Sequence, residues 1–275
     1  MIKEPRHDPI FLAGKLDVAE KEKATNSKFL NRDEVVHLAT NLYEEVFWAN
    51  SYWKLLQQIH NQVGTYYEEI NVSPCFYNLV HNALVKSMLM ELAKIYDTNG
   101  ISLQDLLTAI KPSDNDMFNL INDSPIKHRV SDYDKWYFKK DIDKYHEICD
   151  LLKQDRTYPI VEMSYNQYYE YLSKQLCAVK KSRDKLRVQR NNALAHNGET
   201  YNFDLKTLNE KFPIVKEDVD KLIKYALELT IFVVEKLTGV SKPETSIDID
   251  DWNRTLELVR EGQRTIDKEC DEVLL

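Results

Sequence analysis

Residues 32–67 read RDEVVHLATNLYEEVFWANSYWKLLQQIHNQVGTYY, and this stretch decides the class of fold. Its apolar side chains recur at steps of three and four residues, the spacing that places them on one face of an α-helix. We therefore predict a long amphipathic helix from near Arg32 to near Tyr67, with its apolar stripe facing a core. The residues of the stripe are Val36, Ala39, Leu42, Val46, Ala49, Trp53, Leu56 and Ile59.

The rest of the chain divides into further helical segments between sequence breakers. Ser73-Pro74 combines an N-cap residue with proline at the first helical position. Ser102 begins a capping sequence, and Gly198 and Gly239 each follow a periodic segment in the place of a helix C-cap. We predict helices near residues 73–96, 102–110, 131–156, 159–198, 219–239 and 252–273, and a small helical piece within residues 112–125.

The composition favours the same class of fold. Only 6 glycines and 8 prolines occur in 275 residues, and no run of alternating apolar residues with turn pairs is present. We predict an all-α protein, an antiparallel bundle of four to five long helices with short accessory helices. Residues 1–31 are charged and weakly periodic and are expected to form a poorly ordered N-terminal arm. The bundle should span residues 32–241, and residues 242–275 should form an acidic linker and a C-terminal accessory helix.

Charge and cysteine usage exclude several classes of protein. A formal net charge of −8 argues against a protein that coats nucleic acid indiscriminately. The chain has no basic start followed by an apolar run and no stretch of about 18 apolar residues, so a cytoplasmic protein without a membrane partner is expected. The cysteines lack paired spacing, which favours buried reduced thiols over zinc ligands or disulfides. They are Cys75, Cys149, Cys177 and Cys270.

Common catalytic motifs are absent from the sequence. It contains no Gly-rich phosphate loop, no Gly-x-Ser-x-Gly elbow and no His-Glu-x-x-His helix. Most nucleotide-hydrolysing, esterase and metalloprotease activities are therefore not expected. We predict neither a metal nor an organic cofactor.

The segment RNNALAH, from Arg190 to His196, carries the clearest chemical signal. A guanidinium can bind a phosphate through two hydrogen bonds, and an imidazole can move the proton of an attacking ribose hydroxyl near neutral pH. On an ideal helix the two residues lie about 9 Å apart along the axis and about 120° apart around it. A long arginine can bridge that angle and meet the imidazole at the rim of a cleft.

The helix that leads into this segment is strongly basic although the protein is acidic. Asp184 is the only acidic residue among its cations, so an anion-binding strip is predicted beside the motif. The residues expected to bind RNA are Lys181, Lys185, Arg187 and Asn192. The alternative is an ordinary solvated helix face. The cations are Lys174, Lys180, Lys181, Arg183, Lys185, Arg187 and Arg190.

Arg190-Asn191, followed by four residues and His196, resembles the Arg-x(4 to 6)-His signature of the HEPN superfamily, including the alanine before the histidine. Residues 90–97, which read MELAKIYD, are similar to the second-helix region of the abortive-infection, AbiU-type branch of that superfamily. Ser102-Leu103 and Leu106-Leu107 extend the similarity. It covers roughly residues 35 to 240.

The resemblance implies a helical bundle that forms a homodimer, with two copies of the motif in a composite cleft. It further implies a metal-independent endoribonuclease in phage defence or a toxin-antitoxin system, with RNA as substrate and an antitoxin or regulatory protein as a further partner. His196 would act as general base or acid, Arg190 would hold the scissile phosphate, and Asn191 would orient one of them. The products would carry a 2′,3′-cyclic phosphate and a free 5′-hydroxyl.

One position departs from the family pattern. In toxins that are silenced by a minimal nucleotidyltransferase, a tyrosine commonly lies two residues after the histidine. This chain has Gly198 there, and Tyr201 lies three residues further on. Regulation by modification of that tyrosine is therefore not expected, whereas the cleavage chemistry does not depend on it.

Other interpretations of the same residues stay open. Arg190 and His196 could be structural, binding a neighbouring carboxylate or capping their own helix. The chain could then be a non-catalytic HEPN module that binds RNA or protein, or a structural helical subunit of an assembly. Tyrosines could stack unpaired bases, but their helical spacing favours core or dimer packing; they are Tyr165, Tyr168, Tyr169 and Tyr171. The remaining histidines, including His128, are expected to be ordinary surface or core residues.

Overall fold

The computed structural model describes residues 31–97, 100–112, 125–190, 213–246 and 251–273. Over these residues the predicted class is confirmed, because the chain is mostly helical and its long helices pack against one another. The one sheet in the described part has two short strands. Residues 1–30 of the expected N-terminal arm and most of the helical piece expected within residues 112–125 lie outside the described residues.

Helix α1 (Arg32–Gln62) begins with a capping box. The Asn31 side chain accepts from the Glu34 N–H at 2.9 Å, and the Glu34 carboxylate accepts from the Asn31 N–H at 2.8 Å. The predicted stripe is buried as expected, although Val36 and Trp53 are only partly buried. The helix ends before Tyr67, because a turn closes at residues 63–66 and a separate short helix α2 (Tyr67–Asn71) follows.

Helix α3 (Pro74–Tyr96) and helix α4 (Leu103–Ala109) have the predicted bounds. Pro74 occupies the first turn as expected, but the Ser73 side chain makes no capping hydrogen bond. In α4 the expected capping is confirmed, since Ser102 and Asp105 bond each other's backbone N–H groups. Asp97 caps the end of α3.

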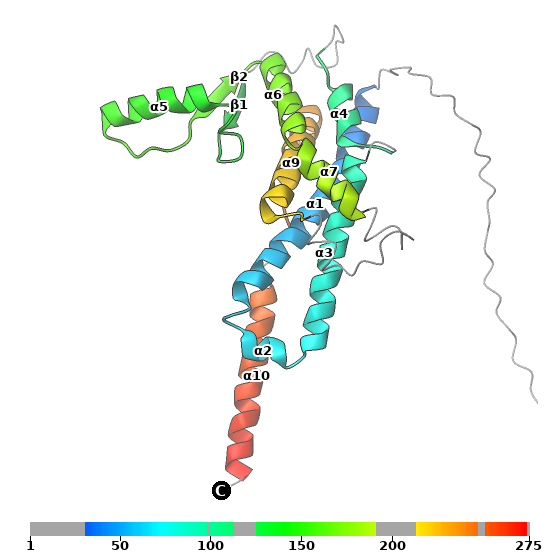
Figure 1. Cartoon of the computed structure of the whole chain (residues 1–275), viewed down its shortest axis with the longest axis vertical. Helices are drawn as coiled ribbons and strands as arrows, with labels where there is room; N and C mark the ends of the chain where they lie inside the picture. Colours follow the sequence, from blue (N-terminus) through cyan, green and yellow to red (C-terminus); the bar gives the residue numbers. More distant parts are fainter. Residues whose placement is uncertain (1–30, 98–99, 113–124, 191–212, 247–250, 274–275) are drawn as a thin grey trace, which may run out of the picture.

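The helix predicted over residues 159–198 begins later and contains a break. Residues up to Met163 form a strand, and a Ser164–Gln167 capping box starts helix α6 (Tyr165–Ala178). At Val179 the backbone has ψ of 2°, and helix α7 (Lys180–Gln189) continues in a changed direction. Figure 1 shows this bend. The stretch that leads to Gly198 lies outside the described residues.

Helix α9 (Lys216–Thr238) ends as predicted at Gly239, whose φ of 72° is left-handed and favours glycine. An extended segment, residues 240–246, then returns along α1. The Tyr43 hydroxyl donates to the Pro243 carbonyl at 2.7 Å, and the Asn50 amide donates to the Glu244 carbonyl at 3.0 Å. Helix α10 (Asp251–Val273) follows. It contacts α2 and α1 and continues past the bundle instead of crossing it (Figure 1).

Helix α1 lies at the centre of the bundle, packed against both α3 and α9. Figure 1 shows that α3 and α9 run antiparallel to α1, and that α6 with α7 runs back beside α9. The core is almost wholly aliphatic and aromatic. Its largest fully buried side chains are Leu92, Ile95, Leu103, Leu106, Ile110, Tyr171, Leu172, Leu186, Leu222, Tyr225 and Leu229.

The segment between α4 and α6 differs most from the prediction. Strands β1 (Ile126–Arg129) and β2 (Ile160–Met163) pair antiparallel, with His128 opposite Val161. The helix predicted from residue 131 to 156 is shortened to α5 (Lys139–Leu152), because residues 131–138 form turns. Asp134 is buried in this turn and bonds His128, which holds the chain away from a regular helix. Figure 1 shows α5 projecting sideways from the bundle.

The cysteines are only partly as expected. Cys149 is buried, but Cys75 and Cys177 are exposed, so the expectation of burial is wrong for these two. Both lie on the solvent side of amphipathic helices, where sequence composition does not distinguish a thiol from its polar neighbours. The Cys270 side chain lies outside what the structure describes. No helix in the described part of the chain has the length and apolar character needed to cross a bilayer.

Leu92→Ala should test the core directly. Leu92 is fully buried in α3, whereas Leu151 in the projecting helix α5 is 83% exposed. Leu92→Ala removes buried methyl groups and leaves a cavity, and it should lower the free energy of unfolding by about 2–5 kcal/mol. Leu151→Ala should change it by less than about 0.5 kcal/mol. Urea denaturation followed by circular dichroism measures both values, and equal losses would contradict the burial assigned to Leu92.

Candidate functional site

Arg190 lies at the end of α7, where it contacts the end of a different helix. Its guanidinium donates from Nη1 to Oδ2 of Asp97, the residue that caps α3. The two side chains are only 20% and 23% exposed, so this ion pair is partly withdrawn from solvent. The sequence suggested only a helix stop at Asp97. Its contact with Arg190 was missed because the two residues are 93 positions apart and no local spacing pattern connects them.

The other motif residues lie outside the described residues. Asn191, Asn192 and His196 belong to that part of the chain, so their roles stay predictions. Of the segment from Arg190 to His196, the structure describes Arg190 alone. Arg190 has helical backbone angles directly after α7, and its charged group is held against α3.

The basic residues of α7 fall into two groups. Lys181 and Arg187 are exposed and available to an anion in solvent. Lys185 instead donates to Oδ2 of Asp218 at 2.6 Å, and Ser182 donates to Oδ1 of the same carboxylate at 2.7 Å. Burial raises the pKa of Asp218, but the hydrogen bonds from Lys185 and Ser182 outweigh it and leave the pKa below its ordinary value. Lys185 therefore joins α7 to the first turn of α9.

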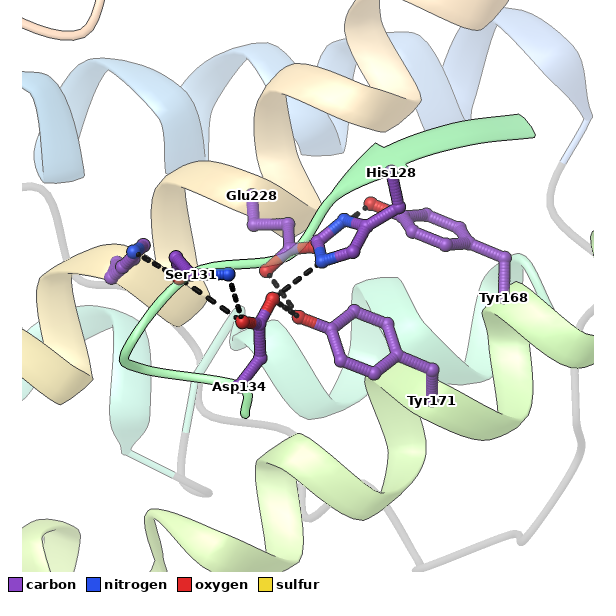
Figure 2. A network of polar contacts seen from close by, with 7 residues as sticks. His128, Ser131, Asp134, Tyr168, Tyr171 and Glu228 are labelled. Carbon is purple, nitrogen blue, oxygen red and sulfur yellow. Dashed lines mark hydrogen bonds and ion pairs between the residues drawn. The ribbon is translucent and has the colours of Figure 1, made fainter. Parts of the chain in front are cut away.

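A second group of polar side chains lies under β1 and was not predicted from the sequence. Figure 2 shows the His128 ring between two carboxylates, with tyrosine hydroxyls directed at them. Nε2 of His128 bonds Oδ2 of Asp134, and Nδ1 lies 3.3 Å from Oε1 of Glu228. Tyr168 donates to Oε1 of Glu228 at 3.2 Å, and the Tyr171 hydroxyl lies 3.2 Å from Asp134 and 3.0 Å from Glu228. Four elements meet here: β1, the following turn, α6 and α9.

The pKa values of the two carboxyl groups in this network, Asp134 and Glu228, are shifted in opposite directions. Burial raises the pKa of Glu228, and the nearby His128 and Tyr171 reduce this rise without cancelling it. Burial also raises the pKa of Asp134, but the hydrogen bonds from His128 and from the backbone of Ser131 outweigh it and lower the pKa overall. Asp134 therefore stays ionised, whereas Glu228 retains a proton more readily than an exposed glutamate does.

This network is structural and not a catalytic centre, because it holds β1 and the following turn against α6 and α9. Both nitrogens of His128 face protein carboxylates, so neither is directed at an external substrate. The ring also packs against Phe138 and Tyr171, with centroids 5.2 and 4.9 Å away. His128 is therefore a core histidine, one of the two kinds of residue expected. In the sequence, only a serine three residues before Asp134 and tyrosines spaced three apart indicated the network.

The tyrosine group packs as the helical spacing predicted. Tyr165, Tyr168 and Tyr171 are buried and Tyr169 is half-buried. The rings of Tyr168 and Phe232 lie 4.6 Å apart between α6 and α9. Core packing is confirmed for these tyrosines, which leaves little ring surface for unpaired bases. In the described ranges, no three His, Cys, Asp or Glu side chains are grouped as metal ligands.

Comparison with known proteins supplies one match. A family model described as AbiU2, of the HEPN superfamily, matches residues 32–255. This range covers most of the chain and includes α1, Asp97, all of α7 and Arg190. The searches of curated proteins and of solved structures found no match.

Asp134→Ala should destabilise the protein far more than Asp132→Ala. Asp134 is 1% exposed, and its loss leaves His128 and the Ser131 backbone N–H without their shared acceptor. Breaking such a buried pair should lower the free energy of unfolding by about 3–5 kcal/mol. Asp132, two residues earlier, has a side chain that is 79% exposed, and its removal should cost about 0–1 kcal/mol. Urea denaturation at pH 7 measures both; comparable losses would show that the network contributes no special stability.

Glu228→Gln should change how stability depends on pH above 4.5. Burial raises the pKa of Glu228 above its ordinary 4.5, so the folded protein binds this proton more tightly than the unfolded chain. The wild type should therefore lose stability as pH rises from 4.5 through the folded-state pKa, whereas glutamine does not titrate. The loss should be about 1.4 kcal/mol for each unit of the shift. Urea denaturation from about pH 4.5 to 8 compares the two proteins, and a constant difference between them would contradict the shift.

Proposed function

The chain belongs to the AbiU2 branch of the HEPN superfamily, and from this membership we propose that it is a metal-independent endoribonuclease. The family relates it to abortive infection. The proposed role is therefore cleavage of cellular or phage RNA during phage defence or within a toxin-antitoxin system. The observation that carries the proposal is the Arg190–His196 motif, which begins where the basic helix α7 ends.

The proposed reaction uses the groups of this motif and a proton donor for the leaving oxygen. His196 removes the proton of the ribose 2′-hydroxyl, and the 2′-oxygen attacks the adjacent phosphorus. The bond from phosphorus to the 5′-oxygen breaks, and that oxygen takes up a proton from a general acid. One product ends in a 2′,3′-cyclic phosphate and the other begins with a free 5′-hydroxyl. Arg190 offsets the charge that builds on the phosphate oxygens, and Asn191 orients one of these groups.

The contact between Arg190 and Asp97 supports a fixed position for the guanidinium. A guanidinium can bind a carboxylate on one edge and a phosphate on another, because its donors form a planar fork. Asp97 thereby acts as a positioning residue, which holds Arg190 near the end of α3. Lys181 and Arg187, exposed on the same helix, would attract the RNA backbone toward Arg190. Lys185 and Asn192 are proposed to add to this strip.

We further propose that the protein acts as a homodimer with a regulatory protein as partner. Exposed apolar side chains on and beside the first half of α3 offer a surface for a second copy. Val72, Phe76 and Leu79 are each more than half exposed, and no Asp or Glu occurs from Pro74 to Met90. Two copies could therefore approach there without repulsion between carboxylates. Light scattering of the full chain tests the dimer.

His196→Ala should abolish RNA cleavage. Purified protein and total RNA in EDTA should give fragments with cyclic-phosphate ends, and His196→Ala should slow their formation by about 10²–10⁴-fold because proton transfer is lost. Arg190→Ala should slow it by about 10²–10³-fold. His146→Ala, on the projecting helix α5, serves as the matched control and should cleave at the wild-type rate.

The outcome also separates the alternatives. Intact RNA after incubation with the wild type would overturn the proposed activity, and RNA binding retained under those conditions would select a non-catalytic binding module. Asp97→Asn should reduce cleavage less than Arg190→Ala, since the guanidinium remains but loses its ionic anchor. A wild-type rate for Asp97→Asn would exclude the positioning role.

A further inference from the structure

A large groove runs along helix α9. It has a volume of about 1100 Å³ and lies between α1, α9, and β1 with its following turn. We propose that this α1–α9 groove binds single-stranded RNA, an inference that rests on the proposed function and specifies where the substrate strand lies. Its lining includes Trp53 and Lys54 of α1, Arg129 of β1, and Lys216, Asp220 and Lys236 of α9.

The length of the groove suits a strand better than a compact ligand. Its lining positions on α9 run from Lys216 to Lys236, a distance of about 30 Å at 1.5 Å per residue. Pockets for small molecules are usually clefts of about 300–1,000 Å³ that enclose most of the ligand. This groove instead follows nearly the whole of α9, which Figure 1 shows lying against α1.

Most carboxylates that line the groove accept hydrogen bonds from protein groups, several of them neutral, which occupy their oxygen atoms but leave their negative charge in place. Asp220 accepts from the Trp53 indole N–H at 2.6 Å and from Gln57 at 3.3 Å. Glu235 accepts from the Ser241 hydroxyl at 2.7 Å. Asp132 pairs with Lys135 outside the groove at 3.1 Å, and Asp134 and Glu228 belong to the buried network. Glu244, at the rim, is the exception, since its contact to Asn50 uses its backbone carbonyl.

Several cations of the groove lack such partners. Lys54, Arg129, Lys216 and Lys236 are exposed, and no carboxylate in the described ranges forms an ion pair with them. They come from three elements on different sides of the groove. An anion in the groove would therefore meet unpaired positive charge from both walls, although the protein as a whole has a net charge of −8.

The buried floor adds little negative charge to oppose an anion. Burial raises the pKa of Glu228, so this carboxyl group retains a proton more readily than an exposed one. Asp134 is ionised, but it bonds directly to His128. The floor beneath the exposed cations thus carries less negative charge than its two carboxyl groups would have in water.

Aromatic rings on the walls favour single-stranded RNA over a polyanion that has no bases. Trp53 and Tyr133 line the groove and are half-buried. The Lys224 ammonium lies over the Tyr133 ring, 5.2 Å from its centroid, so Trp53 is the proposed stacking platform. The bond from Trp53 to Asp220 fixes the orientation of the indole. Unpaired bases stack on such rings while cations follow the phosphates, a combination typical of proteins that bind single-stranded nucleic acid.

One end of the groove is connected to the basic helix α7. Lys216 lines the groove, and Asp218, two residues further along α9, binds Lys185 and Ser182 of α7. The first turn of α9 thus contacts both the groove and the helix that ends at Arg190. A strand that leaves the groove at this end meets Lys181 and Arg187, the exposed cations of α7.

RNA binding by groove variants tests the inference. In the full-length His196→Ala background, fluorescence anisotropy measures binding of a labelled oligouridine of about 12 nucleotides. Lys54→Ala/Arg129→Ala/Lys216→Ala should raise Kd by roughly tenfold or more and reduce the salt slope by about two. Trp53→Leu should raise Kd by about tenfold through lost stacking. Thermal unfolding checks that each variant remains folded.

A charge-matched control removes the same number of cations elsewhere. Lys139→Ala/Lys140→Ala/Lys144→Ala changes exposed residues of the projecting helix α5, and it should leave Kd within about twofold of the parent. An equal loss in this control, or no loss in the groove variant, would overturn the proposal. Equal affinity for double-stranded RNA, or for a polyglutamate peptide, would overturn it as a site for single strands.

The same proteins with His196 restored separate this inference from the proposed activity. If the wild type cleaves RNA and the groove variant binds and cleaves it normally, the groove proposal fails and the ribonuclease stands. If the wild type cleaves nothing but the groove variant loses RNA binding, the ribonuclease fails and the groove stands.

Discussion

The burial of α1 on two sides is the constraint on which the rest of the structure depends. A helix of 31 residues with an apolar stripe along most of its length needs partners that cover all of it, and α3 and α9 together provide them. The polar contacts of α1 follow from this arrangement. Arg32 donates to the Leu237 carbonyl at 2.5 Å, and Tyr43 and Asn50 hold residues 240–246 against α1. The first helix of the chain therefore determines where its last segments lie.

The projecting segment is attached to this bundle by buried apolar side chains, among them Val130 and Phe138, and by a group of polar contacts. His128, Asp134 and Glu228 connect β1 and its turn to α9, and the tyrosines of α6 complete their hydrogen bonds. A buried group of this kind is costly unless every member is paired, so it specifies one position for the turn. That position also sets one wall of the α1–α9 groove. Stability and the proposed RNA contact therefore depend on the same few residues.

The two proposed RNA-binding surfaces are joined through the start of α9. Asp218 binds α7 while Lys216 lines the groove, so the distance between the basic helix and the groove is fixed by one helical turn. The bend at Val179 gives α7 the direction that permits the Lys185 contact and leads Arg190 to Asp97. In the proposed arrangement the exposed cations of the groove lead to those of α7, so that an acidic protein would bind a nucleic acid at a defined place and would not adhere to it generally.

The sequence by itself determined the helical class, the extent of α3, α4, α9 and α10, and the motif that identifies the family. These features depend on periodicity, capping residues and short spacing, which are local along the chain. Only the tertiary structure decided that residues 131–138 and 160–163 are not helical, that Asp97 contacts Arg190, that Lys185 is bound to Asp218, and that His128 lies between two carboxylates. Each of these depends on partners many residues apart, and no local pattern encodes which distant side chain will satisfy a buried polar group.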